Sequence, residues 1–311
     1  MNTKPMILVT GATGAQGGSV VRALLKGNKF KVRALTRNAG SEKAVALKNA
    51  GVEVVEGDLE DTASLMNAMN GCYAVFGLTS FWEHFDKEFR QGKNLVDAVY
   101  RSGITHFVFH TLQDYNKLSN GEFEVPHYDM KAALQGYTKA LKIPATFIHT
   151  AFYYENFFSL FPLKMTEEGD FYFGFPQGNT RLAMTSSEDV GGVVATILDH
   201  PSEYIGRTVG VVGSDETCSD YAAMMSRILG RRIRYTYIPR EVYANLGFRA
   251  AEEIANMFEV QRLYIPNRHL DLIESYGLNP AMQTFESWLK KNRKKFDAFF
   301  ESLSVPSGQP V

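Results

Sequence analysis

The stretch Thr10-Gly11-Ala12-Thr13-Gly14-Ala15-Gln16-Gly17-Gly18 decides the fold of this chain. It directly follows the short β-branched run Met6 to Val9, which is typical of a buried strand, and it leads into apolar residues at helical spacing. Glycines at positions 11, 14 and 17 allow a sharp turn whose backbone N–H groups approach a pyrophosphate at a helix N-terminus. A merely structural turn is the alternative, but a glycine-rich loop between a strand and a helix favours phosphate binding. We expect all seven residues Gly11, Ala12, Thr13, Gly14, Ala15, Gln16 and Gly17 to contact a nucleotide.

Short apolar runs and amphipathic stretches alternate through the first half of the chain. Strands are predicted at 6–9, 30–35, 52–55, 73–76, 106–109 and 145–148, and helices at 19–26, 63–69, 87–101 and 129–141. Strands that alternate with helices imply right-handed crossovers and a parallel sheet covered on both faces. The expected fold class is therefore α/β, with residues 1–150 forming a doubly wound, nucleotide-binding Rossmann domain.

The second half of the chain has a weaker alternation. Residues 151–303 are expected to form a smaller C-terminal lobe on the substrate or partner side, with some segments able to return to the Rossmann sheet. Helices are predicted at 189–198, 220–229 and 288–300, and a strand at 234–238. The many aromatic residues between 151 and 185 fit either the lining of a pocket or a plug between sheet and lobe. Residues 304–311 are expected to be a disordered tail.

The end of the second predicted strand indicates which dinucleotide binds. An acidic residue there would bind the ribose 2′-hydroxyl of NAD, whereas an arginine accommodates the 2′-phosphate of NADP. This chain has Arg37 and Asn38 at that point, followed by Ser41 and Lys43, with no carboxylate before Glu42. A solvated surface arginine is the alternative interpretation of Arg37. We expect the cofactor to be NADP(H), contacted by these four residues.

Further contacts are expected where the third and fourth strands end, because strand ends face the ligand crevice of an open α/β sheet. Asp58 and Leu59 follow the third strand. The Asp58 carboxylate is a candidate for the adenine amino group, although capping of the next helix is a nearly equal alternative. Thr79, Ser80 and Phe81 follow the fourth strand and should border the middle of the cofactor.

Several segments together resemble the NmrA-like family, an atypical branch of the short-chain dehydrogenase/reductases. The resemblance is carried by Gly11 to Val20, Phe30 to Arg33, Thr36 to Asn38, Gly57-Asp58, Tyr153 to Asn156 and Ala255 to Phe258, and it extends over nearly the whole chain. These segments resemble those of the NADPH-sensing NmrA-like proteins of animals. The resemblance implies an NADP(H)-binding Rossmann domain with a smaller α/β lobe, and it implies a redox sensor whose association with partners follows NADPH supply.

The catalytic set of the wider group is incomplete in this chain. Ordinary reductases use a Ser, a Tyr and a Lys four residues after that Tyr, with the Lys lowering the pKa of the Tyr. Here Lys131 is present, but His127 occupies the tyrosine position, and Tyr128 would point roughly 100 degrees away on a helix. Thr111 is the hydroxyl near the serine position. Lys131 is the candidate nicotinamide-ribose lysine, and His127 is either an acid or a polar residue at the rim of a pocket.

The same resemblance places further residues at the cofactor. Tyr153, Tyr154, Glu155 and Asn156 should border its nicotinamide end, and Arg90 should approach it from the fourth helix.

Composition narrows the function classes. The chain has 311 residues and a formal net charge of −1, which argues against a protein that coats nucleic acid or an anionic membrane. The basic groups Arg231 to Arg234 and Lys290 to Lys295 are therefore interpreted as solvated faces. Cys72 and Cys218 predict neither a disulfide nor a zinc site, and the histidines show no metal-ligand spacing. No targeting or membrane-spanning segment is recognised, so a cytoplasmic location is expected.

Three functions remain open from the sequence. The first is an NADP(H)-binding redox sensor whose self-association, as a homodimer, or whose binding to a protein partner responds to NADPH. The second is an NADPH-dependent oxidoreductase that reduces a small carbonyl, quinone or imine substrate without the usual Ser-Tyr-Lys set. The third, a DNA-binding regulator acting through Arg231 to Arg234, is not expected, because it requires a large basic surface.

Overall fold

The computed structural model describes residues 4–80 and 87–304, and it divides into two compact units. The first unit comprises Met1–Thr150, Ser187–Val211 and Ile273–Met282, and the second comprises Ala151–Ser186, Val212–Leu272 and Gln283–Val311. Phe81, which is predicted to contact the cofactor, and the predicted tail from residue 305 onward lie outside the described residues.

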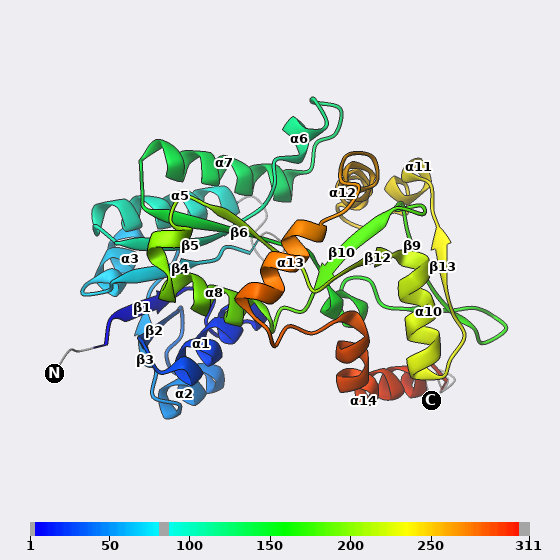
Figure 1. The fold of residues 1–311 in the computed structure, drawn as a ribbon, viewed down its shortest axis with the longest axis horizontal. Helices are drawn as coiled ribbons and strands as arrows, with labels where there is room; N and C mark the ends of the chain where they lie inside the picture. Colours follow the sequence, from blue (N-terminus) through cyan, green and yellow to red (C-terminus); the bar gives the residue numbers. More distant parts are fainter. Residues whose placement is uncertain (1–3, 81–86, 305–311) are drawn as a thin grey trace, which may run out of the picture. The chain divides into compact units, whose positions relative to one another are not determined.

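The first unit is built on a seven-stranded parallel sheet (Figure 1). The strands, in spatial order, are β11 (Thr208–Val211), β6 (Ala145–Thr150), β5 (His106–Thr111), β4 (Ala74–Gly77), β1 (Met6–Val9), β2 (Lys31–Thr36) and β3 (Glu53–Glu56). Every neighbouring pair in this order is parallel. The chain order reverses between β1 and β4, which is the point where open α/β sheets bind ligands. The α/β class and the parallel Rossmann sheet are thus confirmed.

Helices connect these strands and pack on the sheet. They are α1 (Ala15–Gly27), α2 (Glu42–Asn49), α3 (Thr62–Met69), α5 (Glu88–Arg101), α6 (Tyr115–Leu118), α7 (Pro126–Ala140), α8 (Val190–Asp199) and α9 (Pro201–Tyr204). Helix α5 contacts both α3 and α7, and α1 packs against α8 (Figure 1). The last contact is very close, because a Cβ on Gly191 would lie 2.1 Å from the carbonyl oxygen of Ser19. Buried aliphatic and aromatic residues of the strands, such as Leu8, Val75 and Phe107, form the core with these helices.

The second unit contains two small sheets and a group of helices. One sheet has the order β12 (Ser214–Thr217), β10 (Arg181–Thr185) and β7 (Phe152–Tyr153), and the other has β13 (Ile233–Tyr237), β9 (Phe171–Phe175) and β8 (Lys164–Met165). Its helices are η2 (Tyr154–Phe158), α10 (Cys218–Leu229), α11 (Arg240–Ala244), α12 (Ala251–Tyr264) and α14 (Phe285–Ser304), while α13 (His269–Leu278) begins in this unit and ends in the first. Phe152, Phe157 and Phe175 are buried, and the ring of Phe175 stacks on that of Phe258. Many of the aromatic residues therefore form the core of this unit.

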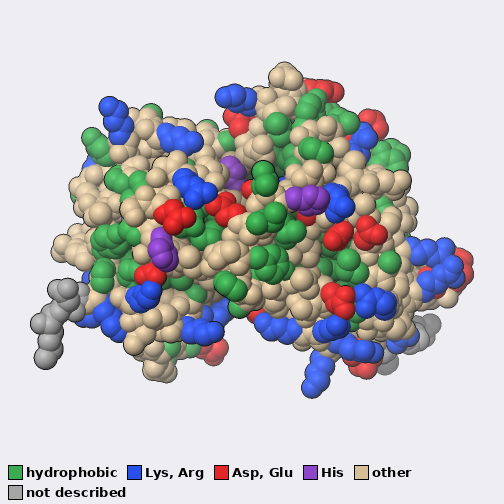
Figure 2. Space-filling model, in the orientation of Figure 1, with side chains coloured by type: hydrophobic (Ala, Val, Ile, Leu, Met, Phe, Trp, Pro, Cys, Tyr) green, Lys and Arg blue, Asp and Glu red, His purple; other side chains and the backbone are tan. Residues whose placement is uncertain are grey.

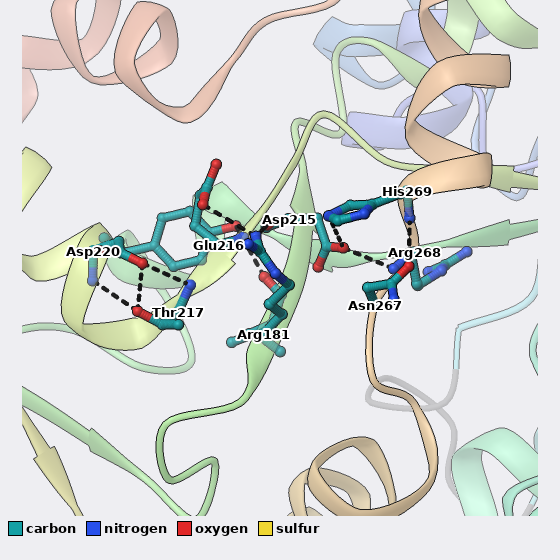
Figure 3. A network of polar contacts seen from close by, with 10 residues as sticks. Arg181, Asp215, Glu216, Thr217, Asp220, Asn267, Arg268 and His269 are labelled. Carbon is teal, nitrogen blue, oxygen red and sulfur yellow. Dashed lines mark hydrogen bonds and ion pairs between the residues drawn. The ribbon is translucent and has the colours of Figure 1, made fainter.

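A polar network fixes the start of α13 within the second unit (Figure 3). Asp215 on β12 is buried, and its Oδ2 accepts a hydrogen bond of 2.7 Å from the backbone N–H of Arg268. The same oxygen lies 3.6 Å from Nε2 of His269. On the other side, the guanidinium of Arg181 reaches the backbone oxygen of Asp215 and the carboxylate of Glu216. These contacts hold β10, β12 and the first residues of α13 together.

The basic group after α10 is partly paired within the second unit. Arg232 and Arg234 both lie within ion-pair distance of Asp170, and the guanidinium of Arg231 lies over the ring of Phe300. On the face displayed in Figure 2, basic and acidic side chains are interspersed.

The described residues hold no disulfide, no metal-binding cluster and no helix suited to spanning a membrane. Cys72 and Cys218 are both free thiols. No cluster of three metal-binding side chains occurs in residues 4–80 and 87–304. Within these ranges, no helix combines the length and the apolar character that crossing a membrane demands.

Candidate nucleotide site

The glycine-rich loop turns tightly between β1 and α1. Gly11 has a φ of 61°, in the left-handed region, and its carbonyl oxygen accepts a hydrogen bond of 2.9 Å from the N–H of Gly14. A Cβ on Gly17 would lie 2.3 Å from that same oxygen and 2.7 Å from the carbonyl oxygen of Thr10. Backbone atoms cannot give way as a flexible side chain can, so only glycine fits at position 17.

The start of α1 is open for an anion. Gly14 is the N-cap and has no side chain to accept a hydrogen bond from the first turn, and the first turn contains no acidic residue. Helix N-termini in this state bind phosphate through backbone N–H groups and the helix dipole. The hydroxyl of Thr10 accepts from the N–H of Leu78 at 2.7 Å, which ties the loop to the end of β4. The predicted loop residues are therefore brought together at the reversal of strand order.

Two basic residues, Arg37 and Lys43, follow the end of β2. Arg37 and Lys43 are exposed, and no carboxylate among the described residues forms an ion pair with either of them. Ser41 caps α2 by accepting from the N–H of Ala44, and Asn38 accepts from the N–H of Gly40 through its Oδ1. Two cations thus follow the strand where a 2′-phosphate is expected, and in the same turn the N–H of Ala39 donates to the Glu56 carboxylate at 3.0 Å.

Asp58 lies in an exposed turn after β3. Its Oδ1 accepts from the N–H of Glu60 at 2.9 Å, and its own N–H donates to Ser64. The N-cap of α3 is Asp61, whose carboxylate accepts from the N–H groups of Ala63 and Ser64. The alternative role of Asp58 as the helix cap is therefore wrong, because the cap residue lies three positions later and the helix begins at Thr62. The backbone oxygen of neighbouring Leu59 accepts from Asn94.

The end of β4 leads to a buried ionic cluster. The ammonium of Lys131 donates to the Glu88 carboxylate at 2.5 Å, to the Thr79 hydroxyl at 2.9 Å and to the Thr79 carbonyl at 3.1 Å. The Thr79 hydroxyl in turn donates to Oε1 of Glu88 at 2.7 Å. Glu88 is wholly buried and Lys131 nearly so. All three donors of the ammonium are engaged, so a ribose hydroxyl would have to share or replace one of them.

Glu88 is absent from the residues predicted from the sequence. The sequence pattern identifies Glu88 as a buried carboxylate. Positions 88, 92, 95 and 99 lie on one face of α5, and the other three positions hold Gly92, Leu95 and Val99. A carboxylate on the buried face of a helix requires a partner, and Lys131 is that partner.

His127 lies one helical turn before Lys131 on the same face of α7, and both residues are buried. Its ring meets the ring of Tyr128 edge-on, and Tyr128 stacks on Tyr115 instead of facing the position of the usual catalytic tyrosine. The hydroxyl of Thr111 donates to Gln135 at 2.7 Å. The described residues thus place an imidazole and an ammonium on one buried face of α7, with the ammonium at the end of β4, while Tyr128 packs against Tyr115.

The remaining predicted contacts differ in their surroundings. Ser80 is half-buried after β4, whereas Arg90 is exposed on α5 and lies 3.3 Å from the carboxylate of Glu60. Tyr153 to Asn156 belong to the second unit. There Tyr154 is buried and donates to Ser214, and the Glu155 carboxylate accepts from Ser186 and Trp288. The role of these four residues at the cofactor stays a prediction.

Comparison with known proteins gives one consistent result. The model of the NmrA-like family matches residues 3–300. An NmrA-like family domain-containing protein of Dictyostelium discoideum is 28% identical and covers 94% of this chain and 99% of its own length. The NmrA-like oxidoreductase FrzB of Cladobotryum sp is 30% identical over 81% of this chain and 82% of its own. A crystal structure of the negative transcriptional regulator NmrA with NADP superposes with a TM-score of 0.81 at 21% identity, covering 97% of this chain and 99% of that one. The chain therefore belongs to the NmrA-like family.

Proposed function

We propose that this protein binds NADP(H) in the first unit and acts as a redox sensor, with self-association or partner binding that responds to NADPH. The observation that carries the cofactor assignment is the open N-terminus of α1 behind a loop in which Gly17 admits no side chain, next to Arg37 and Lys43. The structural neighbour NmrA was crystallised with NADP, which supports the same assignment.

The sensor role is favoured over catalysis by the residues around Lys131. The position of the usual tyrosine holds His127, and the Lys131 ammonium is already bound by Glu88 and Thr79. A cofactor site that lacks the usual proton-transfer residues supports a protein that binds NADPH without oxidising it. A cytoplasmic location remains part of this proposal.

The cofactor assignment can be tested by titration with NADPH, NADP, NADH and NAD. We expect the 2′-phosphorylated forms to bind more tightly, because charged hydrogen bonds to the phosphate add binding energy. Arg37→Ala should weaken NADPH binding roughly 10- to 100-fold and leave NADH binding nearly unchanged. Arg101→Ala, which removes an exposed arginine in the last turn of α5, is the matched control. Equal affinity of the unmodified protein for NADH and NADPH would refute the role of Arg37.

The second candidate function is reduction of a small carbonyl, quinone or imine. It is favoured by the burial of His127 and Lys131 on one face of α7 and by the oxidoreductase name of the relative FrzB. NADP(H) would supply the hydride, and the imidazole could move a proton. Steady NADPH oxidation with an acceptor, lost in His127→Ala, would establish this activity. Absence of turnover across carbonyl, quinone and imine acceptors, with NADPH binding intact, would reject it.

A further inference from the structure

Glu88 is the least expected charged residue of the first unit. It lies in the first turn of α5, where its side chain has no exposed surface, and it pairs with a lysine that is only 6% exposed. A buried ion pair costs desolvation energy for both groups, and it contributes little net stability. Stability alone therefore gives no reason for a carboxylate at this position.

Oε1 of Glu88 lies 2.5 Å from the Lys131 ammonium, so the two residues form a buried ion pair. The carboxylate accepts a second hydrogen bond at Oε1 from the Thr79 hydroxyl. Its other oxygen, Oε2, is buried and has no hydrogen-bond partner among the described residues. Lys131 and Glu88 together thus carry no net charge.

The nearby His110 adds no positive charge to this pair. His110, at the end of β5, is fully buried, and burial lowers its pKa well below the usual value, with a smaller contribution from the Lys131 ammonium. Its Nε2 pairs with the Thr150 hydroxyl, whereas its Nδ1 is buried without a partner in the described part of the chain. A neutral imidazole therefore stands beside the neutral Lys131–Glu88 pair.

The cluster lies where the fold binds ligands. Thr79 follows β4, which neighbours β1 at the reversal of strand order, and β1 leads into the glycine-rich loop. Ligands of open α/β sheets occupy the crevice outside these strand ends. Two buried polar atoms without partners, Glu88 Oε2 and His110 Nδ1, are a second sign that a polar ligand group belongs here.

We propose that Glu88 sets the balance between the two redox forms of NADP(H) by cancelling the charge of Lys131. This inference rests on the proposed function. The nicotinamide ring carries a positive charge in NADP⁺ and none in NADPH. A lone Lys131 would repel the oxidised ring and hardly affect the reduced one, whereas the Lys131–Glu88 pair removes this repulsion, so that NADP⁺ can compete with NADPH for the site of a sensor.

The test is the ratio of the dissociation constants for NADP⁺ and NADPH, measured by titration of the whole protein. Glu88→Gln keeps the shape of the side chain and removes its charge. It should raise this ratio about tenfold, because a unit charge several ångströms away in a partly buried site contributes an interaction of that size. Lys131→Met leaves Glu88 uncompensated and should lower the ratio, while the double variant should return it close to the original value.

Controls separate this inference from a structural effect and from failure of the proposed function. Asp97→Asn removes another carboxylate of α5, one that pairs with Lys93, and should not change the ratio. If Glu88→Gln does not fold, Lys131→Met and the double variant still decide the question. A Glu88→Gln variant that weakens both redox forms equally, or an opposite shift in Lys131→Met, would overturn the role of Glu88. If the unmodified protein binds neither form, the proposed function itself fails.

Discussion

Replacement of Gly17 should test most directly whether NADPH binding depends on the conformation of the glycine-rich loop. In Gly17→Ala, the new Cβ would meet the carbonyl oxygens of Gly11 and Thr10, so the turn must open. We expect a loss of about 1–3 kcal/mol in the free energy of unfolding, together with a loss of NADPH binding. Denaturant unfolding and cofactor titration measure the two effects.

A matched control for this substitution lies in α7. Gly136 is a helix residue whose added Cβ would have no atom within 4 Å beyond the adjoining backbone of its own helix, so Gly136→Ala should stabilise the protein by up to about 1 kcal/mol. Gly17→Ala that unfolds at the same denaturant concentration as the unmodified protein would contradict the geometry of the loop.

At the residue scale, the sequence predicted single groups better than pairs of groups. The role of Gly11, Gly14 and Gly17 can be predicted from their spacing, because the turn that requires them is formed by residues close together in the sequence. The pairing of Glu88 with Lys131 joins residues 43 positions apart, and no local pattern reports which lysine a buried carboxylate meets. For the same reason, the sequence could not show that all three donors of Lys131 are already used.

At the scale of elements, strands β5 and β6 are joined by a buried histidine that should make stability depend on pH. The Thr146 hydroxyl donates to the Tyr204 carbonyl, so it accepts from Nε2 of His106, whose Nδ1 is buried without a hydrogen-bond partner among the described residues. Burial lowers the pKa of His106 to about 4. As the pH falls from 6.5 to 4, the unfolded chain therefore binds the proton first, and the free energy of unfolding decreases.

We expect this loss to reach up to about 3 kcal/mol, following from a pKa difference of about 2.5. His106→Gln keeps an N–H donor toward Thr146 and removes the titration, so its unfolding free energy should fall less steeply between pH 6.5 and 4. Buried His110, whose pKa is also lowered, leaves part of the slope in place. Parallel pH profiles for His106→Gln and the unmodified protein would reject this assignment.

Elements were predictable where the sequence has either a short apolar run, typical of a buried strand, or apolar residues at helical spacing. The six strands predicted in the first half and the helices α1, α3, α5 and α7 are confirmed, with ends that differ by a few residues. Helix α12 was not predicted from the sequence. All residues from Ile254 to Val260 are buried, so the buried positions do not recur at helical spacing. Strand β11 is only four residues long, and a return to the sheet by so short a run depends on distant contacts with β6.

At the scale of the whole molecule, a net charge of −1 hides a local excess of positive charge around Arg37 and Lys43. If NADPH binding there changes self-association, the two equilibria must be coupled, and the coupling must act equally in both directions. We expect NADPH, but not NADH at the same concentration, to shift the mass of the protein in sedimentation. The midpoint of an NADPH titration should then move with protein concentration, and a tenfold change in dimer affinity corresponds to about 1.4 kcal/mol of coupling.

Arg37→Ala should abolish both effects at cofactor concentrations where the unmodified protein is saturated. A midpoint and a mass that stay constant across this range, with NADPH fully bound, would exclude self-association as the response and leave binding of a different protein as the form of sensing to be tested.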